Sequence, residues 1–137
     1  MTKNIAILGS TGSIGTQALE VVREQPGRFG VELLTCGNNV DLLIKQALEF
    51  KPNAVVIGDA ARLEEVKDAL FPAGIKAYAG ADALEQCVRM EGIELVLTAL
   101  VGYAGLRPTL AAIDAGKHIA LANKNQAVLR HLSSDLD

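Results

Sequence analysis

The chain has 137 residues, half of them apolar, with 4% aromatic residues, no tryptophan and a formal net charge of −3. That length allows one domain with a substantial core, and the mild charge without any basic run argues against nucleic acid as a partner. No apolar stretch reaches the roughly 18 residues of a membrane-spanning helix and no signal peptide is visible, so we expect a cytoplasmic protein without a membrane partner.

Apolar runs of strand type alternate with segments of helical periodicity along the chain. Strands are predicted at residues 4–9, 31–36, 54–57, 95–99 and 118–122, with an edge strand at 75–79. Helices are predicted at residues 14–25, 41–50, 60–70, 82–90 and 107–115. Strands and helices in this rhythm imply right-handed crossovers and a parallel sheet. We predict an α/β protein with a Rossmann-type, doubly wound, mainly parallel sheet and helices on both faces.

The first predicted strand runs into a loop with three glycines spaced three apart, Gly9, Gly12 and Gly15. In a nucleotide-binding unit the first glycine allows a tight turn, the second lets backbone N–H groups approach a phosphate, and the third lets helix and strand pack closely. The pyrophosphate would sit at the amino end of the following helix. The hydroxyls of Thr11 and Ser13 are expected to donate to phosphate or to cap that helix.

The second predicted strand ends in Cys36, Gly37, Asn38 and Asn39, with no carboxylate before Asp41. A cofactor with a free ribose 2′-hydroxyl usually meets Asp or Glu at this point. Backbone N–H groups and Asn amides can instead donate to a 2′-phosphate, which favours NADP over NAD. An Arg or Lys to grip that phosphate is missing from the turn. The alternative is an Asn-rich turn that tolerates left-handed φ angles.

The remaining polar candidates are few. Lys124 follows the last predicted strand and would point its ammonium group at the site, the alternative being a solvated surface lysine. His118 opens that strand at its far end and His131 lies in the tail, so we assign both structural or solvent roles. Cys36 and Cys87 indicate buried apolar positions in a reducing compartment rather than a disulfide.

Four blocks in order give the chain a family resemblance. They are Gly9 to Gln17, Gly37 to Val40, Val101 to Thr109 and Gly116 to Lys124. Together they resemble the amino-terminal, NADPH-binding domain of 1-deoxy-D-xylulose 5-phosphate reductoisomerases. The resemblance covers residues 1–124, which we expect to form the dinucleotide-binding domain, whereas residues 125–137 are expected to form a terminal helix and a frayed tail.

The resemblance implies roles for individual residues. Residues that would hold the cofactor pyrophosphate and the adjacent ribose are Thr11, Gly12, Ser13 and Ile14. Residues that would surround the adenosine end and its 2′-phosphate are Gly37, Asn38 and Asn39. Asn123 would contact the cofactor near the nicotinamide, and Lys124 would reach a sugar-phosphate substrate.

The family's reaction converts 1-deoxy-D-xylulose 5-phosphate to 2-C-methyl-D-erythritol 4-phosphate in non-mevalonate isoprene biosynthesis. The carbon skeleton is isomerised, NADPH then delivers a hydride, and a divalent metal (Mg or Mn) polarises two substrate oxygens. The family implies a homodimer at full length. Its metal ligands and catalytic domain would lie beyond Asp137, so this chain offers no catalytic or metal-binding residue, and we expect it to bind a dinucleotide without completing the reaction.

The chain also departs from the family pattern. Asn125 stands where the family has Glu, and the next residues, Gln126 to Arg130, differ from the small and apolar ones that normally follow. One alternative is an oxidoreductase like homoserine dehydrogenase, which shares the Gly116 to Lys124 block, or like aspartate-semialdehyde dehydrogenase. The latter needs a catalytic cysteine in a later domain, for which neither Cys36 nor Cys87 is placed. Another alternative is a non-enzymatic NADP-binding module.

Overall fold

The computed structural model describes residues 2–100 and 102–121. In that part of the chain six strands form one sheet in the order β4-β3-β2-β1-β5-β6. Their bounds are β1 (Lys3–Leu8), β2 (Phe29–Cys36), β3 (Ala54–Ile57), β4 (Lys76–Ala79), β5 (Leu95–Thr98) and β6 (His118–Leu121). Every pair of neighbours is parallel, and β4 lies at an edge as the sequence predicted.

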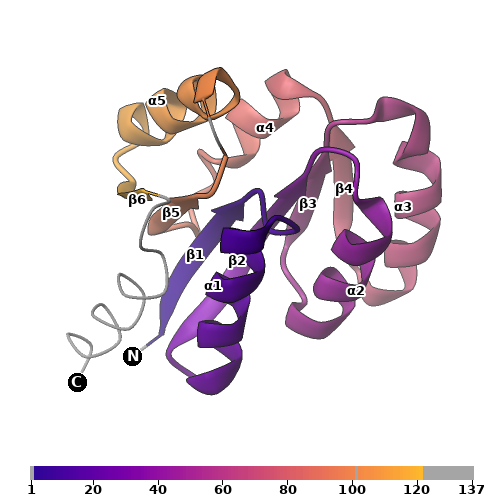
Figure 1. Ribbon diagram of the computed structural model, residues 1–137, viewed down its shortest axis with the longest axis horizontal. Coiled ribbons are helices and arrows are strands. Elements are labelled where there is room, and N and C mark those ends of the chain that lie inside the picture. Colours follow the sequence, from indigo (N-terminus) through magenta and orange to yellow (C-terminus); the bar gives the residue numbers. More distant parts are fainter. Residues whose placement is uncertain (1, 101, 122–137) are drawn as a thin grey trace.

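Helices cover both faces of this sheet (Figure 1). The α-helices are α1 (Ser13–Glu24), α2 (Val40–Phe50), α3 (Leu63–Leu70), α4 (Ala81–Cys87) and α5 (Leu106–Asp114). Three short 3₁₀ helices are η1 (Ala60–Arg62), η2 (Phe71–Ala73) and η3 (Gly102–Gly105). Figure 1 shows α1 and α2 on one side of the sheet and α4 and α5 on the other, which confirms the predicted doubly wound α/β fold.

The alternation of side chains along β1 builds a core on each face. Ile5 and Ile7 pack with the residues of α1, α2 and α3, whereas Ala6 and Leu8 pack with those of α4 and α5. All four side chains are fully buried. A strand that is covered on both faces has no polar positions to spare, which explains why the first apolar run of the sequence is uninterrupted.

Several element boundaries differ from the prediction. The predicted helix 60–70 begins as η1, because the Asp59 carboxylate accepts a hydrogen bond from Ala61 N at 3.1 Å and starts a tight turn. The predicted helix 82–90 ends at Cys87, and the N–H groups of Arg89 and Met90 donate to carbonyls only three residues back. Strand β2 begins at Phe29, two residues early, because Phe29 pairs with Lys3.

The two cysteines are buried and not bonded to each other, in agreement with their predicted apolar role. His118 opens β6 at its amino end, as expected, where its N–H donates to Glu94 O at 3.0 Å. None of the helices in the described part of the chain is long and apolar enough to cross a membrane. The predicted boundary after residue 124, the tail helix and His131 lie outside the described residues.

Candidate dinucleotide-binding site

Three loops meet where the strand order reverses around β1. The chain leaves β1 toward β2 on one side, and β5 lies on the other side, so the carboxyl end of β1 is the switch point at which ligands bind in such sheets. Ser10 N donates to Thr35 O at 2.8 Å, and Ala99 N donates to Leu8 O at 2.8 Å. The loops after β1, β2 and β5 are thus brought together at one edge of the sheet.

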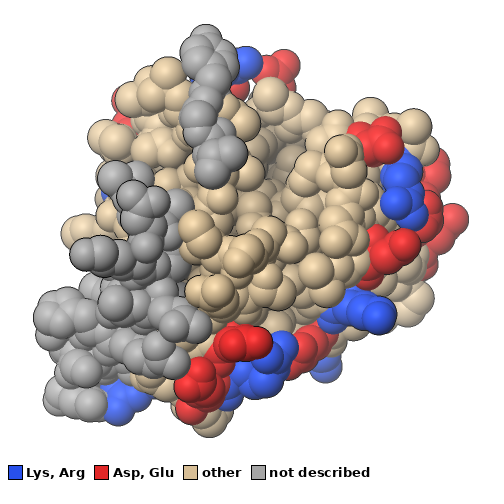
Figure 2. Space-filling view, in the orientation of Figure 1, with Lys and Arg blue, Asp and Glu red and all other residues tan. Residues whose placement is uncertain are grey.

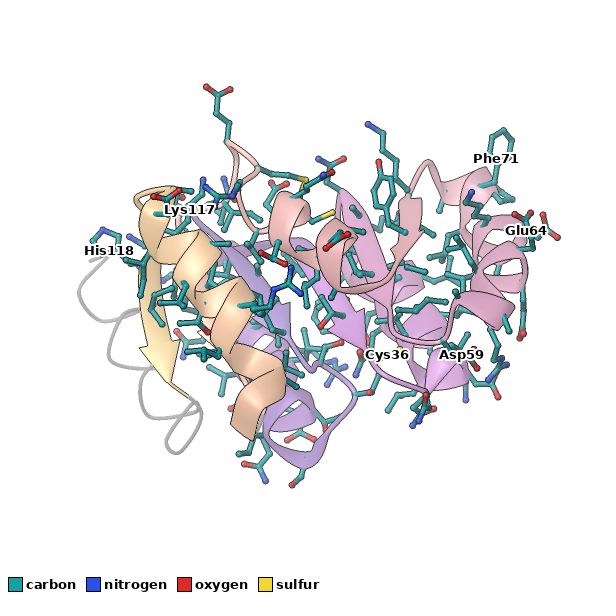
Figure 3. All side chains as sticks on the ribbon, turned by 90° about the horizontal axis from the view of Figure 1, so that it is seen from above. Cys36, Asp59, Glu64, Phe71, Lys117 and His118 are labelled. Atoms are coloured by element: carbon teal, nitrogen blue, oxygen red, sulfur yellow. The ribbon has the colours of Figure 1, made fainter. Side chains whose placement is uncertain are left out.

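Figures 2 and 3 describe the surroundings of this edge. In Figure 3, Cys36 and Asp59 lie toward the end of the sheet to which β6 points, and His118 lies at the opposite end. In Figure 2, the coloured surface at the middle of the face is uncharged, and the charged side chains gather along its lower and right margins. Within the described part of the chain, a phosphate at the glycine loop would therefore depend on backbone N–H groups rather than on lysine or arginine.

The first and third glycines of the loop are required by the fold. Gly9 has a φ of +82°, a conformation that side chains rarely adopt. A Cβ on Gly15 would clash with the carbonyl oxygen of Gly9 and lie 2.6 Å from Ser10 Cα. These observations confirm the predicted roles in turning and in close packing. Gly12, by contrast, has an ordinary φ of −77°, and a Cβ there would meet only Gly9 O at 3.7 Å.

The amino end of α1 carries no side-chain cap. Gly12 occupies the N-cap position, and no side chain accepts from the first turn, so the expectation that Ser13 or Thr11 caps this helix is wrong. Instead the Thr16 hydroxyl bonds the Gly12 carbonyl. The N–H groups of the first helical turn are left without a side-chain acceptor in the described structure, at the positive end of the helix dipole. This arrangement suits an anion.

A buried polar network, which the sequence did not reveal, holds the loop in place. Gln46, on the buried face of α2, donates from Nε2 to Ser10 O at 2.9 Å, and the Ser10 hydroxyl donates to Gln46 Oε1 at 2.8 Å. The Thr35 hydroxyl accepts from Gly9 N at 2.9 Å. The only signal in the sequence is one polar residue among the apolar positions of a helix, beside Leu43 and Ala47, which are also buried.

The turn after β2 exposes Gly37, Asn38 and Asn39. Asn39 is the N-cap of α2 and its Oδ1 accepts from Leu42 N at 3.3 Å, which leaves the amide NH₂ to donate elsewhere. Among the described non-glycine residues only Lys51 has a positive φ. The left-handed conformation that would explain the two asparagines as simple turn formers is therefore not adopted.

A cleft of about 250 Å³ opens beside this turn. Its lining comes from the ends of β2 and β3, the start of α4 and the loop after β5, including Cys36, Gly37, Gly58, Ala81 and Leu100. Gly58 was not predicted. A Cβ on Gly58 would lie 3.2 Å from Gly37 Cα, so its small size lets the loop after β3 pack against the turn.

The thiol of Cys36 does not contribute a reactive group to this cleft. Its residue is 6% exposed, and burial raises the pKa of the thiol to about 11, against a smaller opposing effect of the Arg62 charge. Burial also raises the pKa of Cys87. A neutral thiol is a poor nucleophile, so Cys36 packs as an apolar residue.

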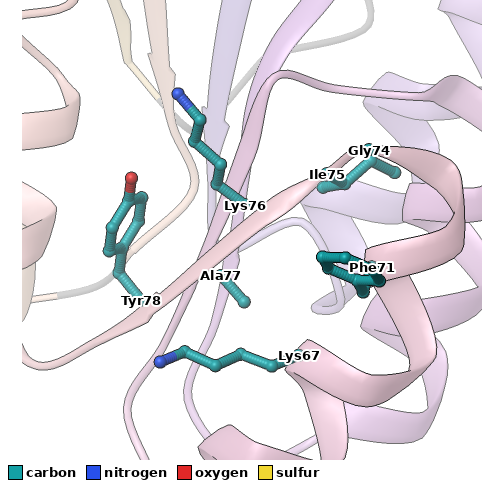
Figure 4. Close-up of a pocket in the computed structure, with 7 residues that line it drawn as sticks. All are labelled: Lys67, Phe71, Gly74, Ile75, Lys76, Ala77 and Tyr78. Carbon is teal, nitrogen blue, oxygen red and sulfur yellow. The ribbon is translucent and has the colours of Figure 1, made fainter.

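A larger hollow of about 410 Å³ lies along the outer edge of the sheet, against β4 (Figure 4). It is lined by Lys67, Phe71, Gly74, Ile75, Lys76, Ala77 and Tyr78. None of the predicted site residues belongs to this lining. Among the residues that the structure describes, no group of three or more His, Cys, Asp or Glu side chains could hold a metal ion. Asn123 and Lys124 lie outside those residues.

Comparison with known proteins gives these features a family. The family model of 1-deoxy-D-xylulose 5-phosphate reductoisomerase matches residues 5–130. The chain belongs to this family. The reductoisomerase of Phocaeicola vulgatus is 57% identical over 129 residues, which are 94% of this chain and 34% of the relative. The enzyme of Porphyromonas gingivalis is 52% identical over the same shares. The chain thus spans about a third of the length of the relatives it matches.

Solved structures of reductoisomerases have the same fold. The Zymomonas mobilis enzyme in complex with NADPH superposes with a TM-score of 0.83 at 34% identity, over 98% of this chain and 37% of that one. A complex with NADPH, fosmidomycin and magnesium has a TM-score of 0.83 at 33% identity, over 97% and 34%. The homoserine- or semialdehyde-dehydrogenase-like alternatives are therefore not favoured.

Proposed function

We propose that this domain binds NADPH as the cofactor-binding part of a 1-deoxy-D-xylulose 5-phosphate reductoisomerase. The observation that carries the proposal is the convergence of two exposed loops on one edge of the sheet, the glycine loop after β1 and the Gly37–Asn39 turn after β2, with no carboxylate at the end of β2. A relative of the same fold is described as a complex with NADPH.

The pyrophosphate is assigned to the segment from Thr11 to Ile14. Its support is the set of uncapped N–H groups at the start of α1, a twelve-residue helix whose dipole favours an anion at that end. The side chains of Thr11 and Ser13 are partly or fully exposed and can add hydroxyl donors. The bound cofactor, rather than the packing of the fold, would then require glycine at position 12.

The adenosine end is assigned to Gly37, Asn38 and Asn39. Gly37 has no positive φ, and a Cβ on it would meet nothing within 4 Å, so the fold does not require glycine there. A ligand that approaches the backbone closely would require it. The Asn39 amide NH₂ is available to donate to a 2′-phosphate, because its oxygen is turned toward Leu42 N.

For the whole protein we infer the family's reaction, conversion of 1-deoxy-D-xylulose 5-phosphate to 2-C-methyl-D-erythritol 4-phosphate. Bound NADPH would supply the hydride, and a divalent metal, Mg or Mn, would be held by residues other than those described. Asn123 is proposed to contact the cofactor near its nicotinamide, and Lys124 to bind the sugar phosphate through its ammonium group. A cytoplasmic homodimer is the proposed working form.

Calorimetric titration of the protein with NADPH and with NADH tests the cofactor assignment. NADPH should bind more tightly, and Gly37→Val should weaken NADPH binding by roughly tenfold or more, about 1.4 kcal/mol, without lowering the unfolding midpoint. Gly92→Val is the matched control, since the nearest atoms there belong to the flexible side chain of Glu32. Failure of the wild type to bind either dinucleotide would end the proposal, and full affinity in Gly37→Val would remove the turn from the site.

The substrate role of Lys124 is tested in the whole enzyme. Lys124→Ala should raise the KM for the sugar phosphate and lower kcat/KM, while the affinity for NADPH stays close to that of the wild type. Unchanged substrate kinetics would take Lys124 out of the site.

A further inference from the structure

We propose that Arg62, at the end of η1, is the cation that recognises the 2′-phosphate of the cofactor and so sets the preference for NADPH over NADH. This inference rests on the proposed dinucleotide site. The turn itself supplies no positive charge, because its residues from Cys36 to Asp41 include no Lys or Arg. Arg62 comes from a different loop, the one that follows the neighbouring strand β3.

The loop after β3 is packed directly on the turn after β2. Gly58 N donates to both Cys36 O at 3.0 Å and Gly37 O at 3.1 Å. The next residue, Asp59, caps η1 through its carboxylate. The loop after β3 is therefore fixed at two points between the cofactor turn and Arg62. Hydrogen bonds from Gly58 hold it to the turn, and the Asp59 carboxylate holds the start of η1.

The guanidinium of Arg62 is held over the first turn of α2. Its Nη2 lies 3.1 Å from an oxygen of Asp41, which follows the N-cap Asn39 by two residues. Its Nε and Nη2 also donate to the two oxygens of Glu65, at 3.0 and 2.7 Å. The positive charge reaches the end of β2, since it acts to lower the pKa of the Cys36 thiol against the larger effect of burial.

This geometry leaves the guanidinium able to bind a phosphate. The hydrogen bond with Glu65, and then that with Asp41, raise the pKa of Arg62 above its already high usual range, so it stays charged. Its Nη1 has no hydrogen-bond partner in the described part of the chain. The Asp41 side chain is 78% exposed and can turn into solvent. A 2′-phosphate would replace Asp41 while Glu65 keeps the fork in position.

The competing interpretation is that Arg62 belongs to an exposed ion cluster that only joins α2 to α3. The two interpretations predict different changes in NADPH affinity for the variants Asp41→Asn and Arg62→Gln. If Arg62 binds the phosphate, the negative Asp41 side chain competes with the negative phosphate for the Arg62 guanidinium. Asp41→Asn should therefore bind NADPH at least as tightly as the wild type. Arg62→Gln should instead lose affinity for NADPH. If the cluster is only structural, both variants remove the same ion pair and should change NADPH binding alike.

The test is calorimetric titration of the whole chain and its variants with NADPH, NADH, 2′,5′-ADP and 5′-AMP. For Arg62→Gln we expect NADPH and 2′,5′-ADP to bind about 10- to 100-fold more weakly, with NADH and 5′-AMP unchanged. Arg62→Lys should recover part of the loss. Arg23→Gln is the matched control, because Arg23 forms a similar exposed pair with Glu49 at the other end of α2. Urea unfolding verifies that each variant is folded.

The outcomes separate this inference from the proposed function. A wild type that binds neither cofactor overturns both. A wild type that prefers NADPH, with the preference intact in Arg62→Gln, overturns only the role of Arg62. Equal weakening of NADPH and NADH in Arg62→Gln, or a loss in Asp41→Asn that matches it, also overturns it. Selective loss of the two 2′-phosphorylated ligands in Arg62→Gln alone supports it.

Discussion

Gln46 anchors the glycine loop from below, and its removal gives the sharpest test of how the site is held. The residue is 6% exposed. Its amide exchanges two hydrogen bonds with Ser10, one to the backbone oxygen at 2.9 Å and one from the hydroxyl at 2.8 Å. Gln46→Leu keeps a similar volume on the buried face of α2 and deletes both bonds.

The expected cost follows from which groups lose a partner. The Ser10 carbonyl would be left buried without the Gln46 donor, which costs about 1–3 kcal/mol. The Ser10 hydroxyl would lose its 2.8 Å bond to Gln46 Oε1 and keep only the longer one to the Thr35 oxygen, at 3.2 Å, and this exchange adds roughly 1 kcal/mol. We therefore expect Gln46→Leu to lower the free energy of unfolding by about 2–4 kcal/mol.

Urea unfolding followed by far-ultraviolet circular dichroism measures this change, with calorimetric titration of NADPH as the second readout. Because the loop loses its anchor, NADPH binding should weaken as well. The control is Gln86→Leu, at an exposed position of α4, which should stay within about 0.5 kcal/mol of the wild type. Equal unfolding midpoints for Gln46→Leu and Gln86→Leu would refute the reasoning.

Gln46→Glu adds a dependence on pH to the same test. A protonated carboxyl can still donate to Ser10 O, whereas a carboxylate would face that oxygen in a buried site. Burial raises the pKa of such a group in the folded state. The variant should be nearly as stable as the wild type below about pH 4.3, the ordinary pKa of Glu, and lose stability as the pH rises through the raised value. A difference in the free energy of unfolding between Gln46→Glu and the wild type that does not change with pH would contradict this.

Three further predictions concern stability. Gly15→Ala should lower the free energy of unfolding by about 1–3 kcal/mol or more, because its Cβ would lie 2.6 Å from Ser10 Cα, whereas Gly12→Ala should cost less than about 1 kcal/mol; similar urea midpoints would refute the packing argument. The raised pKa of Cys36, about 11, gives stability that is complete below pH 9 and lost as the pH rises toward 11, by up to about 3 kcal/mol. Cys36→Ala should abolish that part of the alkaline loss. Arg23→Gln should cost less than about 1 kcal/mol, and less still in high salt, because the pair with Glu49 is half exposed.

Local patterns were enough to predict where the strands lie along the chain. The limits of β3 (Ala54–Ile57) match the prediction, because turn residues flank this four-residue apolar run and fix both ends of the strand. The roles of Gly9 and Gly15 also follow from local geometry, since a tight turn and a close helix contact are both decided within a few residues of the glycine. These elements need no partner from elsewhere in the chain to be recognised.

What the sequence did not reveal depends on contacts between distant residues. Gln46 and Ser10 are 36 positions apart, and nothing in their spacing indicates that they meet. Nothing in the sequence places Arg62 near the turn after β2, because the fold brings it there from the loop after β3. The cap predicted at Ser13 is absent for a local reason: Gly12 takes the N-cap position, and the Thr16 hydroxyl donates to the Gly12 carbonyl.

The central place of β1 has a consequence for how this protein is made. Ile5 of β1 pairs with Leu95 of β5, so during synthesis one side of β1 has to wait for a partner made 90 residues later. At about 5–20 residues per second the interval is roughly 5–18 s. During that time an apolar strand edge is unpaired and open to other chains. Slower translation between β1 and β5 should therefore increase aggregation of the nascent chain, whereas slower translation after β6 should not.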